Sequence, residues 1–464
     1  MAHCSDYSTF SSESDEDRLR RLELECVSLK NYDSVTGLPH LPLFLSQAER
    51  AAQECSRRER PLGVIALSFD SLDGSGALYG LDGGTLLRAI VRRLRSCLRA
   101  EQFIARVGNK FLILLPTFDE ARTSALARRF VEGRMELDLD GSRTVVAVCA
   151  GAAALESWSE DCKRDVRCVM DRAFDALHSA WQRSSGLATT HSPELGRQLR
   201  RKSAIELEFP LAAQRGQLYL LYQPIVEAST GEIVAVEALA RWDHPDLGVV
   251  PPSEFIPIVE RAGMSAAFDQ WVFERALEDY QAMRAVANID LHVNLTPTSL
   301  EEAGAVDARL DAIDAASIPR CDVVLELTET ARAQHFDAVH QNVQRLRAEG
   351  VRVAIDDLGC GFNSLQLFAR MPVDLVKIDR SFLSREDDSD ALTLLRGVVD
   401  TCARLGVEAI IEGVENEPLH QLTLSSGVRY AQGYNYSVPL PASHLLALLD
   451  AGAGQRRIAK DDRS

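Results

Sequence analysis

The chain has 464 residues, 46% of them hydrophobic, and carries a formal net charge of −17 at pH 7. This length favours two or three domains, and the acidic charge argues against DNA, RNA or an anionic membrane as a general partner. The longest apolar stretch, 145–155, is much shorter than the roughly 20 residues that a membrane-spanning helix needs. Ten cysteines without paired spacing, and an N-terminus without a secretion-signal pattern, predict a cytoplasmic chain with reduced thiols.

Residues 1–30 differ in composition from the rest of the chain. Residues 1–15 are rich in serine and acidic side chains, which predicts a disordered tail. Residues 17–30 have a helical pattern, with apolar side chains at a/d-like spacing from Leu19 to Leu29. This lead-in helix could pair with a second copy or remain solvated, and the sequence leaves both interpretations open.

Residues 31–183 alternate between strand and helix patterns, which predicts a layered α/β domain. The expected strands are 62–69, 103–107, 111–115 and 145–151. The expected helices are 41–56, 83–99, 120–133 and 166–181. Residues 184–197 begin with a stretch rich in Ser, Thr and Gly and are predicted to form a linker.

Residues 198–453 repeat a strand and then a helix, and 454–464 form a polar C-terminal tail. The expected strands lie near 218–224, 234–239, 291–295, 323–327, 351–356, 375–378, 408–412 and 430–434. Amphipathic stretches between them include 268–287, 336–347, 390–405 and 443–449. Repeats of this kind in a segment of this length are typical of a (β/α)8, or TIM-like, barrel.

Almost every predicted strand of this second domain ends in an acidic or amide side chain. In a parallel barrel these ends meet on one face, so we expect the side chains to lie together. Burying an ionised carboxylate without a partner is costly, so a ring of them indicates a positive centre, most simply divalent metal. The polar residues concerned are Gln223, Glu237, Asn294, Glu326, Asp356, Asp357, Lys377, Asp379, Glu412, Glu415 and Gln432.

The oxygen ligands in this set favour Mg²⁺ or Mn²⁺ over metals that prefer imidazole or thiolate. Asp357 follows Asp356 directly, so one aspartate could bridge two ions while the other binds the second ion. Two ions held a few Å apart can activate water against a phosphate. Lys377 could orient that water or stabilise phosphate charge, and Glu412 could accept the water's proton, ligate a metal, or both.

Each of these residues also has a purely structural interpretation. Arg241 and Asp379 could bind a phosphate and the edge of a guanine, but Asp379 could equally form an exposed ion pair with Lys377. Asn294 could organise a turn, and Asp356 could belong to an ordinary turn after a strand. These alternatives do not explain why nearly every strand ends in the same way.

The strand-end motifs follow one another in an order that resembles a known family. They are Glu237-Ala238-Leu239, Val293-Asn294-Leu295, Glu326-Leu327-Thr328-Glu329, Asp356-Asp357-Leu358-Gly359, Lys377-Ile378-Asp379, Glu412-Gly413-Val414-Glu415 and Gln432-Gly433-Tyr434. Residues 200–450 thus resemble an EAL domain, the phosphodiesterase family that linearises cyclic di-GMP to pGpG.

The resemblance implies a role for each of these side chains. It implies that two metal ions are surrounded by Glu237, Asn294, Glu326, Asp356, Asp357 and Glu412. It implies that Lys377 and Glu412 serve the attacking water, and that Glu329 steadies the loop after Asp357. It also implies that the dinucleotide is contacted or shaped by Gln223, Leu239, Arg241, Asp379, Glu415 and Gln432.

The first domain resembles a GGDEF domain, the family that makes cyclic di-GMP from GTP. The resemblance rests on Asp33-Ser34-Val35-Thr36-Gly37-Leu38-Pro39 and on Arg172-Ala173-Phe174-Asp175-Ala176-Leu177. Positions that hold the family's active residues instead carry Ser68, Gly76, Ala77, Thr85 and, within 106–111, Asn109 and Lys110. Without carboxylates at a two-metal centre, we expect no cyclase activity. This degenerate domain could serve packing or dimerisation, or bind GTP as a regulatory ligand.

These observations predict a metal-dependent cyclic di-GMP phosphodiesterase behind a degenerate cyclase-like domain. A non-catalytic cyclic di-GMP receptor that acts through an unidentified protein partner is the alternative, and a scaffold that binds no nucleotide is a third. The resemblance also implies a homodimer whose contacts order the loop 358–364. Cys360 in that loop is predicted to be an inert small residue, although oxidation of its thiol could slow the enzyme.

Overall fold

The computed structural model describes residues 31–69, 83–132, 135–139, 142–184, 186–302, 304–327, 336–359, 368–383 and 389–452. The chain divides into two compact units, Met1–Arg200 and Arg201–Ser464. Several predictions fall outside the described residues. They concern the N-terminal tail and lead-in helix (1–30), the C-terminal tail (454–464), Gly76, Ala77, Glu329 and Cys360. Within the described ranges, no helix is both long enough and apolar enough to cross a membrane.

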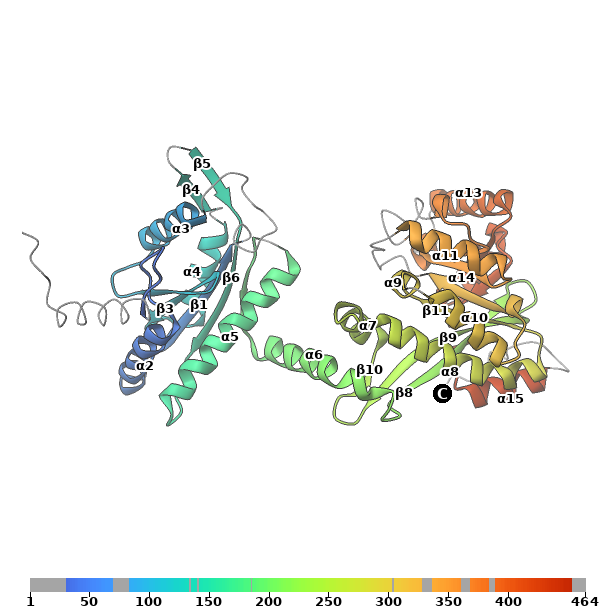
Figure 1. Ribbon diagram of the computed structural model, residues 1–464, viewed down its shortest axis with the longest axis horizontal. Helices are drawn as coiled ribbons and strands as arrows, with labels where there is room; N and C mark the ends of the chain where they lie inside the picture. Colours follow the sequence, from blue (N-terminus) through green and yellow to red (C-terminus); the bar gives the residue numbers. More distant parts are fainter. Residues whose placement is uncertain are drawn as a thin grey trace, which may run out of the picture. The chain divides into compact units, whose positions relative to one another are not determined.

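The first unit is built on a five-stranded sheet with the strand order β2-β3-β1-β6-β7. Its strands are β1 (Leu62–Phe69), β2 (Phe103–Val107), β3 (Lys110–Pro116), β6 (Val148–Leu155) and β7 (Ala188–Thr190). Its helices are α2 (Leu41–Arg57), α3 (Gly83–Cys97), α4 (Glu120–Glu132) and α5 (Cys162–Arg183). A separate hairpin pairs β4 (Met135–Leu139) with β5 (Ser142–Val146), as Figure 1 shows.

Side chains of the central strand β1 alternate between the two faces of this sheet. Ile65 belongs to the apolar cluster that contains side chains of α3 and α4, and Val64 belongs to the cluster that contains those of α2 and α5. Gly151 on β6 permits the close approach of α5, because a Cβ there would lie 2.1 Å from the backbone nitrogen of Leu177. The sheet is therefore covered by helices on both faces, and the predicted layered domain of strands and helices is confirmed.

Three local predictions for the first unit were wrong. The expected strand 145–151 is two strands, β5 and β6, because a continuous apolar run carries no mark of the break between them. The short strand β4 was missed, although its residues alternate between buried and exposed. The strand β7 lies inside the segment 184–197 that was predicted to be a linker, and it pairs in parallel with β6.

The second unit is a closed barrel with helices around it, and the division between the units falls within α6 (Pro193–Ala212). Its strands are β8 (Leu218–Glu227), β9 (Ile233–His244), β10 (Gly248–Val250), β11 (Asp290–Leu295), β12 (Val323–Leu327), β13 (Arg352–Leu358), β14 (Leu375–Ile378), β15 (Glu408–Ile411) and β16 (Tyr430–Gln432). Its helices include α7 (Pro252–Arg261), α8 (Ser265–Val286), α9 (Pro297–Leu300), α10 (Ala305–Ala315), α11 (Phe336–Ala348), α13 (Ser389–Leu405), α14 (Glu417–Ser426) and α15 (Ala442–Gly452). The predicted TIM-like barrel is confirmed.

Two of these strands depart from the regular parallel pattern, and one of them is the short strand β10, which pairs antiparallel with β9. The strand β8 runs antiparallel to both of its neighbours, β9 and β16, and closes the barrel. The connection from Glu227 to Ile233 is too short for a parallel crossover, which needs about a dozen residues. Gln223 therefore lies in the middle of β8, opposite Glu237, and not at a strand end as predicted.

The interior of the barrel is layered. One layer is apolar and consists of Ile225, Ala235, Val324, Ala354, Leu375 and Ile410. Strand side chains on one face recur every two residues, so the next inward positions lie two residues away along each strand. All of these next positions carry polar side chains. These positions are Gln223, Glu237, Glu326, Asp356, Lys377 and Glu412. An apolar floor therefore supports a polar layer, which contains four of the six residues predicted to bind metal: Glu237, Glu326, Asp356 and Glu412.

Candidate metal centre

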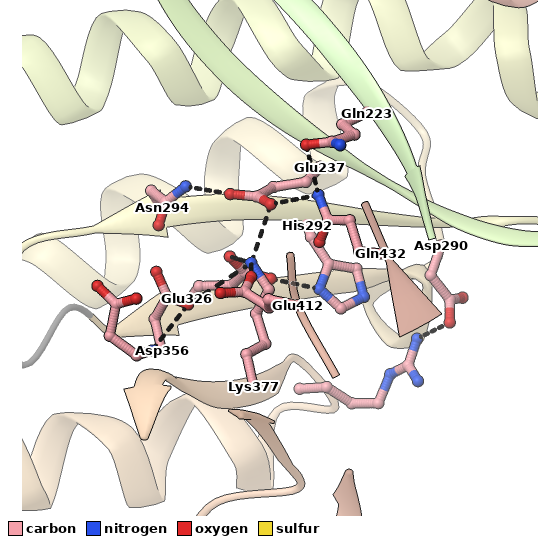
Figure 2. A network of polar contacts seen from close by, with 12 residues as sticks. Gln223, Glu237, Asp290, His292, Asn294, Glu326, Asp356, Lys377, Glu412 and Gln432 are labelled. Atoms are coloured by element: carbon pink, nitrogen blue, oxygen red, sulfur yellow. Dashed lines mark hydrogen bonds and ion pairs between the residues drawn. The ribbon is translucent and has the colours of Figure 1, made fainter. Parts of the chain in front are cut away.

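Lys377 is at the centre of the polar layer. Its ammonium group lies 2.9 Å from Oε2 of Glu237, 2.8 Å from Oε2 of Glu326 and 2.6 Å from Oε1 of Glu412. Oδ1 of Asp356 is farther away, at 3.6 Å. Lys377 donates hydrogen bonds to Glu237 and Glu326, and it forms an ion pair with Glu412. Figure 2 shows how these side chains, from separate strands, converge on the lysine.

Glu237 is held from several directions. Asn294 donates its amide to Oε1 at 2.7 Å, and Gln432 donates to Oε2 at 2.8 Å. Gln432 also donates to Oε1 of Gln223 at 3.2 Å. Burial opposes ionisation of Glu237, but the charge of Lys377 and these hydrogen bonds outweigh it, so the pKa of Glu237 is lowered. Glu237 is therefore a fixed carboxylate.

Asp356, Asp357 and Glu412 form a group of acids whose ligand oxygens lie within 4.8 Å of one another. Consecutive strand residues normally face opposite sides of a sheet. Here the pairing of β13 with β14 shifts register between Ile355 and Leu358, and Asp357 has a left-handed backbone with φ 56°. The bulge explains how two neighbouring aspartates reach the same site.

The electrostatics of this layer fit a divalent cation. Burial raises the pKa of Glu326 and of Glu412 well above the ordinary range, and it also raises the pKa of Asp356. Burial, followed by the charge of Asp356, raises the pKa of Asp357 to about 6. Five carboxyl groups thus surround one lysine and need further positive charge to ionise together. All of them offer oxygen, the ligand that Mg²⁺, Mn²⁺ and Ca²⁺ prefer.

Gln432 supplies a second sign that the layer is built for a ligand. Its Oε1 atom is buried and has no hydrogen-bond partner among the described residues. An unpaired buried amide oxygen is unfavourable unless a ligand or water satisfies it. Gln432 was predicted to contact the substrate, and its place between Gln223 and Glu237 puts it beside the carboxylates.

Sequence reasoning missed His292. This residue of β11 lies deep in the barrel, and its Nδ1 atom is 2.6 Å from Oε1 of Glu326. Burial, then the charge of Lys377, lowers the pKa of His292 to about 3, so its imidazole is neutral. The sequence does contain a sign of this residue, because Asp290, His292 and Asn294 are polar and alternate along β11, which places them on one face of the strand.

A cavity of about 330 Å³ opens beside the polar layer. Glu237, Asn294 and Asp356 form its polar end, and Leu239 and Arg241 line its wall. The remaining lining includes Ile256, Val259, Phe268, Val272, Asp269 and Thr296, which the sequence did not single out. An apolar wall with an arginine and carboxylates at one end can hold a flat ring and an attached phosphate.

Two predicted substrate residues, Asp379 and Glu415, are not part of the lining of this cavity. Asp379 follows β14, and its Oδ1 accepts a hydrogen bond from the backbone N–H of Ser381 at 2.7 Å. Glu415 accepts from Arg380 at 2.7 Å in a half-exposed ion pair. Neither residue lines the cavity described above.

The first unit has a cavity near Ser68, at the carboxyl end of its central strand β1. The cavity measures about 390 Å³ and is lined by Ser68, Asn109, Lys110, Leu177, His178 and Trp181, with no carboxylate among these described residues. Nearby, Asp33 accepts from Thr36 and pairs with Arg106 at 2.9 Å, which fastens the opening turn to β2. The retained opening motif is thus structural.

Comparison with known families decides the identity of the barrel. Residues 206–439 match the family described as EAL domain. The chain belongs to the EAL domain family. Residues 30–185 match the family described as diguanylate cyclase, GGDEF domain, so a GGDEF domain precedes the EAL domain. The family assignment made from the strand-end motifs is confirmed.

Two curated relatives come from Pseudomonas aeruginosa. The bifunctional diguanylate cyclase/cyclic di-GMP phosphodiesterase MucR is 30% identical over 92% of this chain and 63% of MucR. The cyclic di-GMP phosphodiesterase NbdA is 30% identical over 91% of this chain and 54% of NbdA. The chain thus spans between half and two thirds of these relatives' length.

A solved structure supports the fold. The EAL enzyme Bd1971, in its cAMP and cyclic-di-GMP bound form, aligns with a TM-score of 0.51 at 21% identity, over 74% of this chain and 82% of that one.

Proposed function

We propose that the chain hydrolyses cyclic di-GMP to linear pGpG with two bound Mg²⁺ or Mn²⁺ ions. The observation that carries this proposal is the complete oxygen-ligand layer around Lys377, beside a cavity that can hold a base and its phosphate. The names of the relatives MucR and NbdA, which include cyclic di-GMP phosphodiesterase, support the same substrate. Water adds across one P–O3′ bond and leaves a 5′-phosphate.

The residues proposed to hold the cations are the six oxygen ligands Glu237, Asn294, Glu326, Asp356, Asp357 and Glu412. When bound, the cations neutralise phosphate charge and lower the pKa of water. The bulge at Asp357 supports this assignment, because it brings both aspartates to the same side as Glu412. Glu329 is proposed to steady the loop after Asp357, and it lies outside the described residues.

Lys377 and Glu412 are proposed to serve the attacking water. Their side chains lie 2.6 Å apart, so the ammonium favours the ionised form of Glu412, which is the form that can accept a proton from water. Lys377 donates two hydrogen bonds, to Glu237 and Glu326, so its third N–H is the one proposed to orient the water. Its first task is to keep three carboxylates aligned.

The dinucleotide is proposed to enter the cavity that Leu239 and Arg241 line. Arg241 is half-buried, and its Nη1 donates to the carbonyl of Ala240 at 2.8 Å, which fixes the guanidinium at the cavity wall. A guanidinium can bind a phosphate through two parallel hydrogen bonds. Gln223 and Gln432 would contact the ligand from the polar layer, and the rim residues Asp379 and Glu415 would contact it from outside.

The rival function is a receptor that binds cyclic di-GMP and does not cleave it. Incubation of the full chain with cyclic di-GMP and Mg²⁺, Mn²⁺, Ca²⁺ or EDTA separates the two. We expect pGpG with Mg²⁺ and Mn²⁺, little with Ca²⁺, because its coordination is larger and looser, and none with EDTA. Intact dinucleotide under all four conditions, with binding seen by calorimetry, would establish the receptor.

We propose that the chain works as a cytoplasmic homodimer and that the degenerate first domain is structural or regulatory. The cysteines in the described ranges are free thiols, in keeping with a reducing compartment. Light scattering and specific activity over one dilution series test the dimer, because a monomer of constant specific activity would contradict it.

A further inference from the structure

His292 occupies a position where the barrel's apolar floor would otherwise continue. Its paired residue on β12 is Val324, a member of the apolar layer, and its paired residue on β9 is Glu237. The imidazole is 1% exposed. A polar ring buried at this depth is unfavourable without a hydrogen bond, whereas an aliphatic side chain would extend the apolar layer. The packing of the barrel alone therefore gives no reason for a histidine here.

The contact that His292 makes is with a proposed cation ligand. Its Nδ1 lies 2.6 Å from Oε1 of Glu326, and the carboxyl of Glu326 is fully buried. Once a bound cation keeps Glu326 ionised, its carboxylate can only accept hydrogen bonds, so the imidazole is then the donor. Oε2 of Glu326 is 2.8 Å from Lys377, the residue that also contacts Glu237, Asp356 and Glu412. Each oxygen of Glu326 thus has its own partner.

We propose that His292 is a positioning residue of the cation site, which holds Oε1 of Glu326 so that Oε2 faces the other carboxylates. The inference rests on the proposed function, because it assumes that Glu326 binds a cation. A hydrogen bond of this kind to a ligand's second oxygen fixes the carboxylate plane before the cation arrives. Losing such a partner typically weakens metal binding by about 10-fold to 100-fold. Figure 2 shows the imidazole beside the carboxylate of Glu326, with a dashed line joining the two.

The test measures Mn²⁺ affinity of the full chain by calorimetry, together with thermal stability in EDTA. His292→Leu removes the donor and continues the apolar layer, whereas His292→Asn places an amide N–H near the position of Nδ1. We expect His292→Leu to bind Mn²⁺ about 10-fold to 100-fold more weakly, and His292→Asn to recover most of that loss. Wild-type affinity in His292→Leu, whatever its stability in EDTA, would overturn the proposal.

A second variant keeps the test decisive if His292→Leu does not fold. His292→Gln carries the same amide one methylene farther out and cannot place it where Nδ1 lies. We expect weaker Mn²⁺ binding in His292→Gln than in His292→Asn, and equal affinity in these two variants would overturn the proposal. Failure of the wild-type chain itself to bind Mn²⁺ would overturn both the cation site and this inference.

Discussion

The two units place a lysine at the end of a sheet strand, but the surroundings of the lysines are opposite. In the first unit, Lys110 is exposed, and its ammonium lies 5.7 Å from the centre of the Phe174 ring. In the barrel, Lys377 is buried and has four carboxylates within 3.6 Å. The strand ends near Lys110 carry Ser68 and Asn109 in place of acids.

This difference shows that the scaffold and the chemistry of a domain depend on different positions. The sheet of the first unit keeps its two apolar faces, and Asp33 still fastens the opening turn through Arg106. Ser68, Asn109 and Lys110 offer no carboxylate at the end of this sheet, and a metal-dependent reaction needs acids at such positions. In the barrel the same kind of positions are filled, and the fold and the site are both retained.

The largest effect that would sharpen this contrast comes from removing single acids of the barrel. Glu237→Gln and Asp356→Asn keep the shape of each side chain but remove a charge that a cation needs. Because cations supply several kcal/mol of transition-state stabilisation, we expect turnover to fall by at least about 1000-fold. The check is the rate of pGpG formation, with circular dichroism to confirm the fold.

Glu227→Gln is the matched control for those acids. Glu227 lies at the end of β8 and pairs with Arg429 on the surface, so its loss should leave turnover unchanged. Wild-type rates in Glu237→Gln and Asp356→Asn, with unaltered circular dichroism, would place the catalytic site elsewhere.

Removing Lys377 tests whether the buried lysine stabilises the barrel in a way that the exposed Lys110 does not stabilise the first unit. Lys377→Met keeps a side chain of similar length but leaves its carboxylates without their cation. Breaking a buried ion pair costs about 3–5 kcal/mol, so we expect a loss of stability of that order in EDTA. Added Mg²⁺ should recover part of it, because a cation replaces the missing charge. Urea unfolding with and without Mg²⁺ measures both effects, and Lys110→Met, expected to be nearly neutral, is the control.

A smaller effect is expected from a substitution that lowers the stability of the first unit and leaves the activity of the barrel unchanged. Gly151→Ala places a Cβ against the backbone of α5, and overpacking of this kind destabilises a core by about 1–3 kcal/mol. We expect the first unit to unfold at lower temperature while pGpG formation stays at the wild-type rate. Limited proteolysis during heating locates the unfolding, and an equal loss of hydrolysis would show that the barrel depends on the first unit's packing.

The smallest expected signal is from the first unit's own chemistry. In the Glu237→Gln background, any cyclic di-GMP formed would persist and accumulate. We expect none from GTP and Mg²⁺, because Ser68, Asn109 and Lys110 offer no carboxylate. Mass spectrometry of the reaction after long incubation checks this, and detectable dinucleotide would end the account of a degenerate domain.

Much of the site could be predicted because strand-end motifs carry their own spacing. Glu237, Glu326, Asp356 and Lys377 each sit at a recognisable position after an apolar run, so their meeting followed from the barrel. His292 could not be found in the same way, because it lies inside β11 and not at its end, opposite Val324 on β12 and Glu237 on β9. Its role depends on a contact across strands, which periodicity alone does not reveal.

The fold was predictable to a similar extent and failed for similar reasons. Long apolar strands such as β1 and the helices around them stood out by their periodicity. The direction of β8 was missed, although the short connection before Ile233 already indicated a hairpin. The three-residue strand β7 owes its existence to pairing with β6, a contact that local sequence does not record.

The most direct test of the central claim is a single-turnover experiment. The full chain, in molar excess over cyclic di-GMP, is mixed with the dinucleotide and Mg²⁺. All of the dinucleotide is then bound, and slow release of product cannot hide the hydrolysis step. The account predicts complete conversion to linear pGpG in the wild type and intact dinucleotide in Glu237→Gln. Fully bound dinucleotide that stays intact in the wild type would contradict the account and leave the barrel as a receptor.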